Sequence, residues 1–273
     1  RAGGPAGGGV PTWAALAGGA TAVTLILLAL THATSVSANF PTRAEVEWLD
    51  SLPDGSDHLA PDRDAQPGPG PSLSATALFV NVLVTHGLLS CLLVVAAFSA
   101  AIPVSAFGLA ISVEPVAIGV GFGLVLSAVN TVAGLLAERY GYAPSEQLRG
   151  MLTPETLRGW LLLLGGTLPL VAGFEEFLFR GVLVGVFAAG FDASPWALAV
   201  VSSIAFALAH ESQGRVGVVV TGVLGLLLAI GYVLTESLVV VVVAHYLVNA
   251  VELVVFEGFG VGGKQGGRAT PHR

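Results

Sequence analysis

Long apolar runs separated by polar segments constrain the fold of this chain more than any other feature of its sequence. They lie at residues 13–33, 73–100, 115–137, 157–189, 196–210, 216–234 and 238–256. A helix of about 20 apolar residues crosses the ~30 Å hydrocarbon core of a bilayer. Only 11% of the residues are charged, whereas soluble domains carry about 25%. The sequence therefore predicts an all-α, polytopic transmembrane helix bundle of about seven spans, or eight, with no β-sheet of note.

The segments between the apolar runs divide the chain into four parts. Residues 1–38 are predicted to hold a flexible N-terminus and the first transmembrane segment. Because Val36-Ser37-Ala38 resembles a cleavage site, this part is either a span or a signal peptide, and the length of the run favours a span. Residues 39–72 are predicted to form an acidic polar loop, residues 73–257 the transmembrane core, and residues 258–273 a flexible Gly-rich tail.

The distribution of charge predicts location and partners. The net charge is −7 and no basic patch is present, so nucleic acid is not expected as a partner. Of the 11 Lys and Arg residues, all except Arg1 and Arg180 fall in segments on one side of the predicted bundle. The positive-inside rule assigns that side to the cytoplasm. We therefore expect a multi-pass protein of the cell membrane, embedded in lipid, with its C-terminal tail in the cytoplasm.

Glu175, Glu176 and Arg180 interrupt the fourth apolar run. A charge near the middle of a membrane helix costs at least about 2.5–3.5 kcal/mol on insertion scales, so these residues need partners, water, or both. Glu176 and Arg180 are four residues apart and can pair on one helix face, which predicts a structural role for them. Glu175 faces a neighbouring direction without a local partner and is the stronger candidate for function.

Two later runs carry complementary polar groups. The fifth ends in Phe206-Ala-Leu-Ala-His210, and the seventh contains His245-Tyr-Leu-Val-Asn249, whose His and Asn face the same way. A buried carboxylate can act as general base toward a water that a histidine holds. A second histidine and an amide can donate hydrogen bonds to a developing oxyanion. Glu175 and the two histidines would also suit a tetrahedral zinc site. Polar residues that only join helices are the alternative interpretation.

Three motifs in this order resemble those of the CPBP family of intramembrane peptidases, which includes type 2 CAAX prenyl endopeptidases and bacteriocin-processing relatives. They are Glu175-Glu176-x-x-x-Arg180, Phe206-x-x-x-His210 and His245-x-x-x-Asn249. The resemblance covers about residues 157–250 and implies an α-helical intramembrane endopeptidase. It further implies that Glu175 and His210 activate a water molecule and that His245 and Asn249 stabilise the oxyanion. Glu176 and Arg180 would hold the first helix of the site in place.

The resemblance also implies the substrate class, which is a membrane-associated protein or peptide. Prenylated CAAX proteins are expected as substrates only where the host makes them, and peptide maturation or cleavage of another membrane protein is expected otherwise. The cofactor is either zinc, held by Glu175, His210 and His245, or none. We favour the scheme without metal because the acid, the two histidines and the amide serve it fully. The alternative function is non-catalytic, as an immunity or scaffold protein or a transport-like bundle.

Three other patterns lead to packing predictions. Gly119, Gly121 and Gly123 would permit a close helix–helix approach. His86 is interpreted as a hydrogen-bonding packing residue, and Cys91 as a small buried hydrophobe.

Overall fold

The computed structural model describes residues 10–38, 75–139, 153–154 and 156–258, which contain helices and no strand. The predicted acidic loop 39–72 and almost all of the predicted tail lie outside these residues. Five described helices are long and apolar enough to cross a membrane: Trp13–Ala33, Phe79–Ser99, Val113–Leu136, Glu211–Thr235 and Leu238–Gly258. The continuous helical segment 157–191 and the shorter apolar helix Pro195–Leu208 join them, which agrees with the predicted number of about seven.

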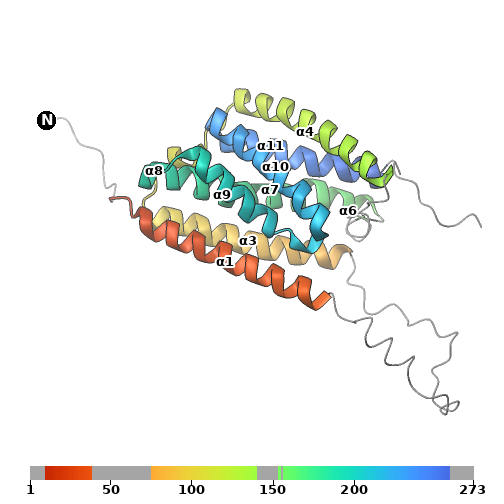
Figure 1. Ribbon diagram of the computed structural model, residues 1–273, viewed down its shortest axis with the longest axis horizontal. Helices are drawn as coiled ribbons and strands as arrows, with labels where there is room; N and C mark the ends of the chain where they lie inside the picture. The colour runs from red at the N-terminus through yellow and green to blue at the C-terminus, as the bar shows by residue number, and fades with distance from the viewer. Residues whose placement is uncertain (1–9, 39–74, 140–152, 155, 259–273) are drawn as a thin grey trace, which may run out of the picture.

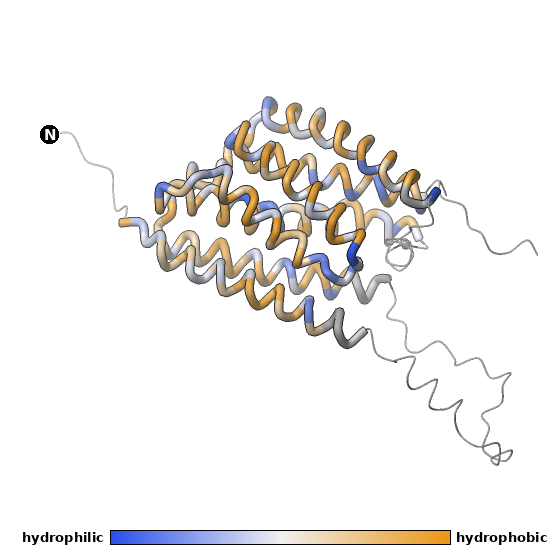
Figure 2. The backbone as a smooth tube through the Cα atoms, viewed as in Figure 1, coloured by the Kyte–Doolittle hydropathy of each residue, from blue (hydrophilic) through white to orange (hydrophobic). Residues whose placement is uncertain are grey.

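The first part of the chain forms the outer helices of the bundle. They are α1 (Trp13–Ala38), α3 (Ala75–Ser99), the short 3₁₀ helix η1 (Val104–Phe107) and α4 (Val113–Arg139). Figure 1 shows α1 and α3 next to each other along one side of the molecule and α4 along the opposite side. Hydrophobic residues cover most of the length of these helices (Figure 2), as a lipid environment requires.

The segment 157–191 is helical throughout but changes its geometry along its length. It consists of α6 (Leu157–Leu162), the π-helix η2 (Leu163–Thr167), α7 (Leu168–Glu176), the π-helix η3 (Phe177–Val186) and α8 (Phe187–Phe191). Wide π turns are rare inside α-helices and occur frequently at functional sites. Here one begins immediately after the Glu175-Glu176 pair.

The last part of the chain forms α9 (Pro195–Leu208), the 3₁₀ turn η4 (Glu211–Gln213), α10 (Gly214–Thr235), α11 (Leu238–Leu253) and the π-helix η5 (Val254–Gly258). Pro195 stands in the first turn of α9, where its missing N–H costs nothing. Ser237 caps α11, because its Oγ accepts a hydrogen bond from the backbone N–H of Val240.

The helices α7 and η3 occupy the centre of the bundle (Figure 1). They contact α3 and α1 on one side, α11 on another and α9 on a third. Leu178 and Val182 of η3 are fully buried there. The charged motif Glu175–Arg180 is therefore surrounded by protein and not by lipid.

The pairing of α4 with α11 depends on two glycines. A Cβ atom on Gly119 would lie 2.8 Å from the Val240 carbonyl oxygen, and one on Gly123 would lie 2.8 Å from the Cα of Ala244. A Cβ on Gly121 would have no neighbour within 4 Å. The prediction for Gly121 was therefore wrong: residues four apart share a helix face, while the residue midway between them points away.

Two single residues on α3 test the remaining packing predictions. His86 Nδ1 donates to the Val82 carbonyl oxygen at 3.1 Å, and its ring packs edge-on against Phe174 at 5.2 Å, so the predicted packing role is confirmed. Cys91 is exposed, and its prediction as a buried residue was wrong. The outer face of a membrane helix meets lipid, so an apolar side chain has no need to be covered by protein.

Candidate active site

The two adjacent acids at the end of α7 have different surroundings. Successive residues of an α-helix point about 100° apart, so Glu175 and Glu176 face different neighbours. The Glu176 side chain is fully buried, whereas the Glu175 side chain is 14% exposed. The same short sequence therefore supplies one acid to the interior and one to a partly open position.

Glu176 belongs to a buried clamp, which we define as Glu176, Arg180 and the backbone carbonyl of Gly225. Arg180 Nη1 donates to Glu176 Oε1 at 3.0 Å, and Nη2 donates to the Gly225 carbonyl oxygen at 2.6 Å. Both charged side chains are fully buried. The predicted Glu176–Arg180 pair is therefore present, and it also ties η3 to α10.

His245 joins the clamp to Glu175. Its Nδ1 lies 2.7 Å from Glu176 Oε1, and its Nε2 lies 3.7 Å from Glu175 Oε2. Because the Glu176 carboxylate accepts, Nδ1 carries the hydrogen of this bond. The packing of α11 against α4 and α7 holds the imidazole in this position.

His210 approaches Glu175 from another helix. It follows the end of α9, and its Nδ1 donates to the Phe206 carbonyl oxygen at 2.8 Å. Its Nε2 lies 3.9 Å from Glu175 Oε1, and its side chain is 21% exposed. The backbone of α9 therefore fixes which nitrogen of His210 faces the acid.

The three groups that converge are all hydrogen-bond acceptors when the histidines are neutral. Both imidazoles use Nδ1 to donate elsewhere, so both Nε2 atoms present a lone pair toward Glu175. The Nε2–oxygen distances of 3.7 and 3.9 Å exceed direct hydrogen-bond length. A group that donates hydrogens, such as a water molecule, would satisfy these acceptors together.

The same three side chains decide how well the site fits a metal ion. Glu175, His210 and His245 have the chemistry of zinc ligands, and each histidine has the outer hydrogen bond that metal-bound histidines usually make. Tetrahedral zinc would bring its ligand atoms to about 3.3 Å from one another, closer than the distances found here. Within the described ranges no group of three His, Cys, Asp or Glu side chains is arranged to hold a metal ion. The ligand atoms are therefore more widely spaced than a tetrahedral zinc site requires.

The structure brings Glu175 of α7, His210 after the end of α9 and His245 of α11 together. Asn249 lies one turn beyond His245 on α11 and is half-buried. Two groups at the site were given no role by the sequence analysis. The Gly225 carbonyl is a backbone group without a side-chain signal, and the ring of Phe206 was part of a motif but had no stated task.

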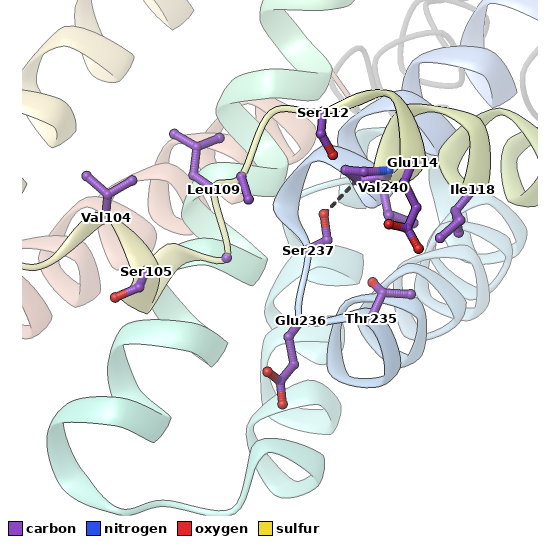
Figure 3. A pocket seen from close by; sticks show the side chains of 13 residues that line it. Val104, Ser105, Leu109, Ser112, Glu114, Ile118, Thr235, Glu236, Ser237 and Val240 are labelled. Carbon is purple, nitrogen blue, oxygen red and sulfur yellow. Dashed lines mark hydrogen bonds between the residues drawn. The ribbon is translucent and has the colours of Figure 1, made fainter.

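A cavity of about 610 Å³ lies elsewhere, between η1, the start of α4 and the turn from α10 to α11 (Figure 3). Glu114 and Glu236 are its charged lining residues. It lies at the far end of α10 from His210, and a helix of 22 residues is about 33 Å long. This cavity contains none of the predicted catalytic residues and is separate from the site.

A family model matches the part of the chain that contains the candidate site. Residues 157–251 match a family model described as type II CAAX prenyl endopeptidase, Rce1-like. The matched segment begins where α6 begins and ends within α11, so it contains all three motifs. No curated protein and no solved structure matches the chain.

Proposed function

Because residues 157–251 carry an Rce1-like domain of the CPBP family, we propose that this membrane-embedded protease cleaves peptide bonds with a water molecule activated at Glu175. The family is one of endopeptidases, so proteolysis is assigned at the family level. The mechanism is our proposal. The observation that carries it is the convergence of Glu175, His210 and His245, with Nε2–oxygen distances of 3.7 and 3.9 Å.

Glu175 is the proposed general base. Its carboxylate is mostly shielded but 14% exposed, so a water molecule can reach it while the surrounding protein limits competing solvent. His210 Nε2 is an acceptor and orients that water by accepting a hydrogen bond from one of its O–H groups. Glu175 takes the other hydrogen as the water oxygen attacks the scissile carbonyl. The proton is then available for the leaving amine.

His245 and Asn249 are the proposed oxyanion donors. His245 already uses Nδ1 to donate to Glu176, so donation from Nε2 requires the protonated imidazole. The negative charge of Glu176, 2.7 Å from Nδ1, stabilises that form. Asn249, one turn along the same face of α11, supplies an uncharged second donor. One oxyanion donor is commonly worth about 10²–10³ in rate.

The proposed substrate is a membrane-anchored protein or a peptide, for which a CAAX peptide is the first probe because the matched family is named for it. The proposed mechanism uses no tightly held metal, because the distances of 3.7 and 3.9 Å between the Glu175 oxygens and the two histidine Nε2 atoms suit a bridging water. Metal analysis of the purified protein, with cleavage measured before and after chelation, tests this. A stoichiometric metal whose removal stops cleavage would contradict the scheme.

The decisive experiment is cleavage of a quenched fluorescent CAAX peptide, farnesylated or unmodified, by the full chain in lipid nanodiscs. We expect Glu175→Gln to abolish cleavage while the protein keeps its helical content and thermal stability. Glu114→Gln is the matched control, because Glu114 is an exposed acid that lines the separate cavity, which contains none of the candidate catalytic residues. Full activity in Glu175→Gln would remove the proposed base.

A further inference from the structure

The aromatic ring of Phe206 contacts the reactive and the structural parts of the site together. Its centroid lies 4.6 Å from that of His210 and 5.9 Å from that of His245. The guanidinium carbon of Arg180 lies over the ring at 4.6 Å from the centroid, a cation–π geometry. Phe179 packs edge-on against the same ring at 5.1 Å. The ring therefore restrains two imidazoles and one guanidinium at once.

The groups around this ring differ in their access to water. His210 is 21% exposed, whereas Glu176 and Arg180 are fully buried, and Phe206 itself is 1% exposed. Glu176 Oε2 and Arg180 Nε are buried without a hydrogen-bond partner. These two atoms would bind water if it could reach them. The apolar ring of Phe206 lies against the guanidinium that carries one of these two atoms, on the path between the clamp and the more exposed His210.

Gly225 on α10 leaves room for the Phe206 ring. A Cβ atom on Gly225 would lie 2.8 Å from Phe206 Cδ1 and 3.3 Å from Arg180 Nη2. Only glycine at this position allows the Phe206 ring and the Arg180 guanidinium to pack against α10 together. The Gly225 carbonyl oxygen then accepts a hydrogen bond from Arg180.

We propose that Phe206 is a positioning residue whose ring forms the wall between the dry clamp and the half-open side of the site that holds Glu175 and His210. The ring fixes the planes of both imidazoles, whose Nδ1 bonds alone leave the ring plane free to tilt. It also excludes water from the unpartnered atoms of the clamp. Phe206 touches no reacting atom in this scheme. Its effect on cleavage rests on the proposed function, whereas its effect on the imidazoles does not.

The activity test compares Phe206→Leu with Phe107→Leu in nanodiscs, using the CAAX peptide. Phe107 is also a buried phenylalanine, but its ring packs on Phe177, away from both histidines. We expect Phe206→Leu to lower kcat by about 100-fold, as small displacements of reacting groups do, with KM unchanged. Phe107→Leu should keep its kcat, and Phe206→Tyr, which retains the ring, should recover most of the loss. Phe206→Met replaces the leucine variant if that variant does not fold.

The second test does not need activity. In protein with ¹⁵N-labelled histidine, the signals of His210 and His245 are assigned with H210Q and H245Q. We expect Phe206→Leu to broaden or split both signals, and Phe107→Leu to leave them unchanged. If the wild-type chain cleaves nothing, the proposed function fails while this test still decides the role of Phe206. Signals unchanged in Phe206→Leu, or kcat lowered equally by both leucine variants, would overturn the proposal.

Discussion

Loss of both members of the Glu176–Arg180 pair should destabilise this protein by clearly less than the sum of the two single losses. Each side chain is fully buried, so removing either partner leaves the other charge buried and incompletely compensated. Arg180→Met leaves Glu176 with only the hydrogen bond from His245, and Glu176→Gln leaves Arg180 with the Gly225 carbonyl. Breaking a buried pair in this way costs about 3–5 kcal/mol. We expect that loss for each single variant.

The double variant Glu176→Gln/Arg180→Met removes both charges and so avoids the part of that penalty that comes from burying one charge without its partner. The two losses should therefore not add, and the interaction energy should reach about 2–3 kcal/mol, the upper part of the range for contacting residues. The measurement is reversible unfolding in mixed micelles, followed by the fluorescence of the four tryptophans. Arg139→Met, at an exposed arginine near the end of α4, is the control and should change stability by less than about 0.5 kcal/mol.

The reasoning fails if each single variant loses less than about 1 kcal/mol and the double variant loses the sum. That result would mean that water or lipid headgroups already solvate the two charges, contrary to their complete burial. A double variant less stable than the sum of the singles would also contradict it, because it would show that the apolar replacements fail to pack.

Two further predictions use matched residues. Gly119→Ala should lower the free energy of unfolding by at least about 1 kcal/mol in the same assay, because the new Cβ would meet backbone atoms of Val240. Gly121→Ala should be neutral or slightly stabilising, because its Cβ would meet no atom within 4 Å. Equal losses in the two variants would contradict the helix faces assigned to these glycines. Ser202→Ala should cost about 1 kcal/mol, because its Oγ donates to the Phe179 carbonyl across two helices. Ser203→Ala should cost less, because Ser203 bonds within its own helix, and the reverse order would refute this.

The helical architecture was predictable because membrane spans have a strong sequence signal. Apolar runs indicated the helices, and the run predicted to begin at residue 238 starts at the first residue of α11. The π turns from Phe177 onward were not predictable from the pattern, because a run that is apolar on every side contains no period that distinguishes a wide turn from an α turn. The exposure of Cys91 was missed for a related reason, since hydrophobicity does not separate lipid-facing from buried positions.

The candidate site was predictable only in part. Helical spacing gave the Glu176–Arg180 pair, because both residues lie on one helix. The contact of Glu176 with His245 joins residues 69 positions apart, so no local spacing could reveal it. The roles of Gly225 and Phe206 depend equally on how α9, α10 and η3 meet. Sequence motifs named the candidate side chains, and the packing of the helices decided which nitrogen of each histidine faces Glu175.

His245 connects the stability of this bundle to its chemistry. One ring nitrogen lies 2.7 Å from the buried acid of the clamp, and the other lies 3.7 Å from the partly exposed acid Glu175. Because Glu176 holds Nδ1 of His245, a change in the clamp should also change the direction in which Nε2 of His245 points. In the proposed mechanism the two adjacent glutamates therefore have different tasks: the fully buried acid holds the histidine, and the partly exposed acid, which lies outside the clamp, serves as the base.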